Sequence, residues 1–167
     1  MDQDAKKTAL RMIPYGLYVL TARTAEGDVT AATVNWVTQA SFTPPLVVVG
    51  VKADSHSFEV VQSAGAFTLN VLGKGQNDVA FAFFKSPEVD ERRIGGHAYR
   101  LGTTGAPILE GPIAFLEGRV REISKGGDHA IVIAEVVDAG VAKQPEGRAD
   151  DATLHMRDLG ERTFYGG

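Results

Sequence analysis

With 167 residues, of which 44% are apolar and 23% charged, and a net charge of −4, the chain has an ordinary globular composition. It lacks the basic stripe that nucleic-acid binding needs, and the absence of cysteine excludes disulfides, thiolate metal sites and cysteine nucleophiles. The histidines have no metal-like spacing, and no signal peptide or run of 18 apolar residues is visible. We therefore expect one cytoplasmic domain over residues 1–167, with neither a metal site nor a membrane span.

The chain opens with a predicted amphipathic helix over residues 4–13, which ends at Pro14. The apolar residues Ala9, Leu10 and Ile13 are expected to dock against the rest of the protein, while the Lys and Arg positions stay in solvent. The pattern therefore predicts a helix that packs by one side.

Two strands, 15–24 and 29–37, are predicted on either side of the turn sequence Glu26-Gly27-Asp28. Thr43-Pro44-Pro45 predicts a corner, because two prolines cannot lie inside a central ladder. The most apolar run, Leu46 to Val51, predicts a fully buried strand.

The second half continues with short elements separated by turn residues. A helix over 58–63 is predicted to begin after Asp54-Ser55-His56-Ser57 and to end at Gly65. Residues 88–106 are charged and contain glycine, which predicts an irregular loop. The remaining predicted elements are a strand over 67–72, a helix over 77–85, strands over 113–123 and 130–137 joined at Lys125-Gly126-Gly127-Asp128, and short edge pieces at 153–156 and 163–165. Six or more strands with two or three short helices and no βαβ rhythm predict a mainly β (α+β) barrel.

Polar side chains are concentrated in one segment between apolar strands, at Thr33, Asn35, Thr38, Gln39 and Ser41. From Thr33 to Thr38 polar and apolar residues alternate as in a half-exposed strand. Such a strand either faces water or lines a site for a flat polar ligand, with Trp36 and Val37 as apolar walls.

The predicted helix start at Asp54-Ser55-His56-Ser57 offers free N–H groups and hydroxyls, which favour an anion such as a phosphate. The alternative is an ordinary N-cap, and the Asp54 carboxylate would have to turn away from a phosphate. His129 either belongs to the surface of a hairpin or contacts a second substrate. Lys85 either complements a helix dipole or reaches a phosphate.

In this order, the segments resemble the flavin reductase-like family, whose fold is the FMN-binding split β-barrel. The resemblance extends from about residue 12 to residue 140, and it rests on Gly16–Thr21, Thr33–Ser41, Pro44–Leu46, Ser55–Ser57, Phe67–Leu72 and Gly127–His129. It implies a homodimer that holds the flavin at or near the subunit interface.

The resemblance also implies roles for particular residues. Flavin-lining residues would be Thr33, Val34, Asn35, Trp36, Val37, Thr38 and Ser41, and Gly50, Val51 and Lys52 would pass beneath the flavin. The phosphate would meet Ser55, His56 and Ser57, with Lys85 as a further contact, and His129 would lie near the nicotinamide. No catalytic side chain is implied.

The function implied is NAD(P)H-dependent flavin reduction, with hydride transfer to flavin N5 and onward transfer to free flavin or a redox-protein acceptor. Trp36 stands where the family often has a small residue, which puts nicotinamide access in question. One alternative is therefore an FMN electron-transfer flavoprotein that does not use nicotinamide. Another is a related split barrel that binds haem, a deazaflavin or pyridoxal phosphate.

Overall fold

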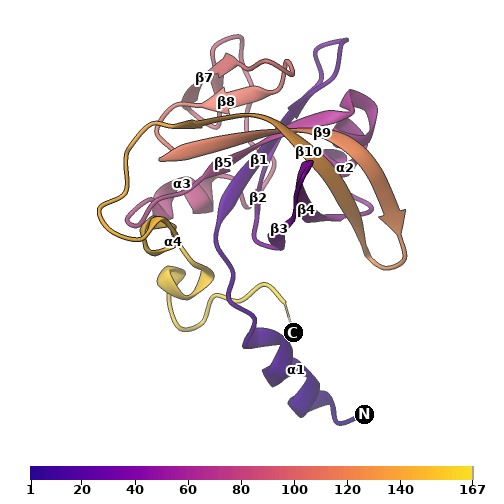
Figure 1. Cartoon of the computed structure of the whole chain (residues 1–167), viewed down its shortest axis with the longest axis vertical. Coiled ribbons are helices and arrows are strands. Elements are labelled where there is room, and N and C mark those ends of the chain that lie inside the picture. The colour runs from indigo at the N-terminus through magenta and orange to yellow at the C-terminus, as the bar shows by residue number, and fades with distance from the viewer. Residues whose placement is uncertain (167) are drawn as a thin grey trace.

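The computed structural model of the chain describes residues 1–166, and its main sheet has the strand order β2-β1-β5-β9-β10-β4-β3 with antiparallel neighbours throughout. These strands are β1 (Tyr18–Arg23), β2 (Val29–Val34), β3 (Val37–Phe42), β4 (Pro45–Lys52), β5 (Ala66–Val71), β9 (Ala114–Lys125) and β10 (His129–Val141). The two edge strands, β2 and β3, are joined by Asn35-Trp36 alone, so the chain itself bridges the open side of the sheet (Figure 1). This is a split barrel, as the resemblance implied.

The predicted single strand over 29–37 is wrong, because the chain leaves the ladder at Asn35-Trp36 and β3 begins at Val37. The chain rejoins the sheet at Val37, which pairs with Val49 of β4, and the Gly50 N–H donates to the Trp36 carbonyl at 2.9 Å. The polar–apolar alternation slips at this place, where Trp36 and Val37 are consecutive apolar residues. The predicted corner is confirmed at Thr43-Pro44, which form the turn between β3 and β4, whereas Pro45 is the first residue of β4 and pairs with Phe42.

The helices are α1 (Gln3–Arg11), α2 (His56–Ala64), α3 (Asn77–Ala82) and α4 (Ala149–Ala152), followed by a 3₁₀ helix, η1 (Met156–Leu159). The second, α2, begins with Ser55 as N-cap and ends at Gly65 in the left-handed conformation, with φ 65°. Its buried face, which includes Phe58 and Val61, packs into the barrel core. Within residues 1–166, no helix combines the length and apolar character that crossing a bilayer requires.

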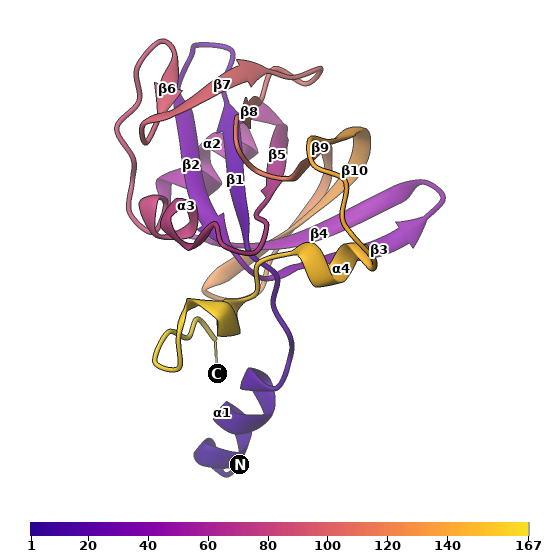
Figure 2. The same ribbon diagram turned by 90° about the vertical axis from the view of Figure 1, so that its left-hand side faces the viewer.

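The first helix, α1, projects from the body of the molecule, as both views show (Figures 1 and 2). None of its residues is buried, and the exposed fractions of Leu10 and Ile13 are 41% and 50%. The expected docking of Ala9, Leu10 and Ile13 is therefore wrong for the single chain, because no part of residues 1–166 buries this apolar side.

The strand β4 is buried on one face only, which corrects the prediction that it is fully buried. Val47, Val49 and Val51 point into the core, whereas the alternate residues Val48 and Gly50 remain half-buried on the outer face. Burial on both faces belongs instead to the neighbouring strands β1 and β5.

Residues 88–106 form more than an irregular loop, because they contribute to a second sheet of β6 (Arg93–Ile94), β7 (His97–Leu101) and β8 (Pro107–Leu109). This sheet lies over β1 and β5 (Figure 2). The loop between β7 and β8 is held on β9 by the fully buried Glu117, whose carboxylate accepts hydrogen bonds from the Thr103 and Thr104 N–H groups at 2.9 and 2.8 Å. A buried carboxylate with these donors is satisfied and structural.

Candidate functional site

Eight of the predicted site residues line two cavities that meet the Asn35-Trp36 link. The inner cavity has a volume of about 280 Å³ and is lined by Leu17, Thr33, Val34, Asn35, Phe84, Met156, Thr163, Phe164 and Tyr165. The outer cavity has a volume of about 750 Å³; its lining includes Leu10, Ile13, Tyr15, Trp36, Val37, Thr38, Val48, Gly50, Gly127, His129 and Ile131. The single polar face expected of 33–38 is therefore divided between two spaces.

The inner cavity is built where β2 meets the end of α3. The Thr33 hydroxyl donates to the Ala80 carbonyl at 2.7 Å, and the Thr33 N–H donates to the Phe83 carbonyl at 3.0 Å. These bonds place Phe84 in the cavity wall, with the exposed Lys85 immediately after it. The side chain of Asn35 is nearly buried and donates to the Tyr165 carbonyl at 3.1 Å.

The outer cavity is centred on Trp36. Its indole lies directly on Gly50, where a Cβ atom would come within 3.1 Å of the ring, so this glycine is needed for the close approach. The His129 ring is stacked at a tilt with a centroid distance of 4.5 Å. The buried Nε1 of Trp36 has no hydrogen-bond partner within residues 1–166.

His129 is held between two side chains rather than exposed on the hairpin. Its Nδ1 lies 3.0 Å from Oδ1 of Asp128, and its Nε2 lies 2.7 Å from the hydroxyl of Tyr165. The hydrogen bond and the charge of His129 lower the pKa of the Asp128 carboxyl. Burial raises the pKa of the Tyr165 phenol, which keeps it protonated and able to donate.

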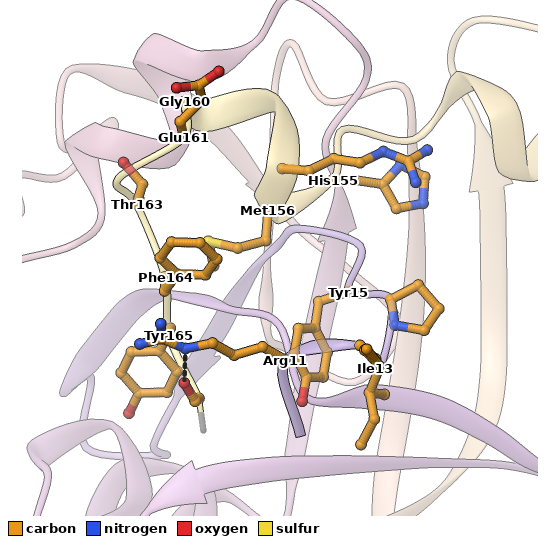
Figure 3. A pocket seen from close by; sticks show the side chains of 14 residues that line it. Arg11, Ile13, Tyr15, His155, Met156, Gly160, Glu161, Thr163, Phe164 and Tyr165 are labelled. Carbon is orange, nitrogen blue, oxygen red and sulfur yellow. Dashed lines mark hydrogen bonds between the residues drawn. The ribbon is translucent and has the colours of Figure 1, made fainter. Parts of the chain in front are cut away.

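Sequence reasoning missed the C-terminal residues beside these two cavities; several of them also line a third cavity of about 350 Å³ between the end of α1 and the tail (Figure 3). Phe164 and Tyr165 line the inner cavity, and Arg11 of α1 lies 4.3 Å above the Phe164 ring. The predicted edge piece at 163–165 is not a strand, although the one at 153–156 does pair through isolated bridges. The one feature of the sequence that could have indicated these residues is the pair of adjacent aromatic residues, Phe164 and Tyr165, in an otherwise polar tail.

The start of α2 lies beside β2 rather than in either cavity. The hydroxyls of Ser57 and Thr30 are 2.7 Å apart, and Ser55 caps the helix by accepting from the Phe58 N–H at 3.2 Å. Thr30 precedes Thr33 by three residues, which is about 10 Å along a strand. An anion at this helix start would therefore lie about 10 Å from Thr33 along the strand and on the opposite face of β2, because side chains three residues apart point to different faces.

His56 at the start of α2 lies between two carboxylates, 3.4 Å from Asp28 and 3.8 Å from Glu59. The remaining predicted flavin contacts lie away from both cavities as well. Val51 points into the core, Lys52 pairs with Asp54 at 3.2 Å, and Ser41 is near the far end of β3.

The residues around the link suit a flavin. Apolar and aromatic walls with a few placed polar groups are the usual surroundings of a planar heterocycle. The unpartnered Trp36 Nε1 and the amide of Asn35 supply donors next to those walls. The helix start at Ser55–Ser57 supplies N–H groups and hydroxyls for a phosphate.

Comparison with known proteins identifies the family of the chain. Residues 10–159 match the family model described as flavin reductase like domain. The chain is 35% identical over 135 residues to a probable flavin reductase of Rhizobium meliloti, covering 81% of this chain but only 42% of that protein. It is 32% identical to a flavin reductase of Pseudomonas putida, covering 94% and 88% of the two chains. The styrene monooxygenase flavin reductase of Pseudomonas putida S12 superposes with a TM-score of 0.73 at 28% identity, covering 96% and 95%. The chain belongs to the flavin reductase-like family.

Proposed function

We propose that the protein is an NAD(P)H-dependent flavin reductase that uses FMN and passes electrons to free flavin or to an oxygenase partner. The proposal rests on one observation: Trp36 contacts Gly50 and His129 at the break between β2 and β3, directly beside Asn35. When bound, the flavin supplies the hydride-accepting N5 atom. Hydride transfer needs no acid or base from the protein, so the Asp128–His129 pair is assigned a role in binding only.

The residues of the chain would then bind and orient. Thr33, Asn35 and Thr38 would contact the edge of the flavin ring, and the indole of Trp36 would form an apolar wall. Ser57 and the first N–H groups of α2 would bind the phosphate, with Lys85 as a mobile countercharge. His129 would orient the nicotinamide carboxamide through Nε2, the atom that contacts Tyr165 in this structure.

The direct test is the colour and turnover of the purified protein. We expect a yellow protein when FMN is supplied, and NADH or NADPH oxidation that depends on added flavin. FMN, FAD and riboflavin should be compared, because the flavin is not fixed by the fold. A colourless protein that ignores all three flavins would refute the proposal and favour a split barrel for another cofactor.

An electron-transfer flavoprotein is the second candidate, because Tyr165 covers the nitrogen of His129 that would meet the nicotinamide. This candidate predicts stoichiometric flavin and no oxidation of either nucleotide. Reduction of the bound flavin by dithionite but not by NADH or NADPH would select it over the reductase.

A homodimer is part of the proposal, and the outer face of β4 and β10 supports it. Ile131 pairs with Gly50 and Ile133 with Val48, so their side chains form an apolar surface on the face away from the core. Ile131 is 47% exposed, and Leu10 of α1 lines the same outer cavity. We expect light scattering to give twice the chain mass for the native protein and the single mass for Ile131→Glu.

A further inference from the structure

The C-terminal tail, residues 163–166, is held by residues that were predicted to bind the ligands. The Asn35 amide donates to the Tyr165 carbonyl at 3.1 Å, and Nε2 of His129 lies 2.7 Å from the Tyr165 hydroxyl. The Tyr165 ring also stacks at a tilt on Trp36, with 5.4 Å between the centroids. A ligand that used these three residues would compete with the tail for the same atoms.

The tail also separates the two cavities. Tyr165 lines the inner cavity, and its other side meets Trp36 and His129, which line the outer cavity. A flavin and a nicotinamide must lie face to face for hydride transfer, which requires one continuous space. Moving Tyr165 would join the two spaces at the link.

The tail is attached by few contacts, and apart from the bond to Asn35 they lie at exposed positions. Tyr165 and Phe164 are 48% and 54% exposed, and the segment has no regular secondary structure. On its outer side Arg11 donates to the Gly166 carbonyl at 3.3 Å and lies over the Phe164 ring (Figure 3). Exposed contacts of this kind are worth little individually, so the segment can open at modest cost.

We propose that the tail is a displaceable cover, and that Tyr165 occupies the place of the nicotinamide ring until NAD(P)H displaces it. The phenol is a six-membered aromatic ring whose hydroxyl meets Nε2 of His129, as the carboxamide group of a nicotinamide would. Tyr165 is thus a specificity-determining residue, because only a ligand that replaces both its stacking and its hydrogen bond opens the site. This inference rests on the proposed function.

Displacement has a measurable consequence for affinity. When a binding-competent state is only partly populated, the apparent affinity falls by the populated fraction. Removing the cover should therefore lower the KM for NAD(P)H while kcat stays near its native value. A tail that merely supports the fold would instead change the stability and leave the KM unchanged.

The experiment compares native protein with Tyr165→Ala, with a chain ending at Arg162, and with Arg162→Ala as an exposed control in the same segment. We expect both tail variants to lower the KM for NAD(P)H by about three- to tenfold, the factor for a site open 10–30% of the time. The apparent Kd for NAD⁺, followed by the emission of Trp36, should fall by a similar factor, since Trp36 is the only tryptophan. Arg162→Ala should change neither quantity.

The outcomes separate the two proposals. Active native protein with an unchanged or higher KM in both tail variants would overturn the cover, whereas the reductase assignment would stand. Protein that binds no flavin and oxidises neither nucleotide would overturn the proposed function and the cover together. Equal thermal unfolding of the variants and the native protein would show that the fold is retained.

Discussion

Replacing Ser57 with alanine tests where the flavin phosphate binds. Ser57 lies in the first turn of α2, and its hydroxyl is 2.7 Å from that of Thr30, so Thr30 can donate to Ser57 while Ser57 donates to a phosphate. A hydrogen bond to a charged group contributes about 1.5–3 kcal/mol, and each 1.4 kcal/mol is tenfold in affinity. We therefore expect Ser57→Ala to weaken FMN binding by roughly 10- to 100-fold. Riboflavin, which has no phosphate, should bind as before.

The measurement is a fluorescence titration of the ligand-free protein with FMN and with riboflavin. Ser63→Ala is the matched control, because Ser63 is exposed near the other end of α2. Ser55 is a poorer choice, since it caps the helix and its loss should also cost about 1 kcal/mol of stability. Equal weakening of both flavins by Ser57→Ala, or none, would refute a phosphate site at this helix start.

Three further predictions follow from the contacts of the site and the second sheet. His129→Ala should raise the KM for NAD(P)H with normal flavin content and return the pKa of Asp128 toward its ordinary value, which a carboxyl NMR titration can follow; if neither changes, His129 has no such role. FMN should quench the emission of Trp36, and Trp36→Phe should remain yellow without that emission; undiminished emission at saturation would place the flavin elsewhere. Glu117→Gln should lower the free energy of unfolding by about 2–4 kcal/mol in urea, because an amide group would face an N–H donor, and a loss below about 1 kcal/mol would contradict this role.

Local sequence signals were sufficient for most of the barrel. Turn residues and alternation predict most of the strands, and the split type of barrel follows from the resemblance of the segments to the flavin reductase-like family. The break at Asn35-Trp36 was missed because a two-residue link between strands looks like a continuous strand. The break is visible in the sequence as two consecutive apolar residues, Trp36 and Val37, which interrupt the polar–apolar alternation.

Contacts between distant segments could not be predicted in this way. The strands within 93–109 exist because they pair with each other over β1 and β5, not because of local propensity. The apolar side of α1 was correctly recognised, but periodicity does not say what covers it. The position of Tyr165 depends on His129 and Asn35, which are 36 and 130 residues away along the chain.

The location of the site follows from how the barrel closes. An edge strand leaves backbone N–H and C=O groups unpaired, and closed barrels avoid this by joining their edges. In this chain the two edges, β2 and β3, are consecutive, and Asn35-Trp36 crosses between them outside the ladder. If closing the barrel were the only requirement, the hydrogen-bonded ladder would continue through Asn35 and Trp36. The interruption instead turns Asn35 toward the inner cavity and Trp36 toward the outer cavity, which provides polar and aromatic contacts on both sides of one short segment.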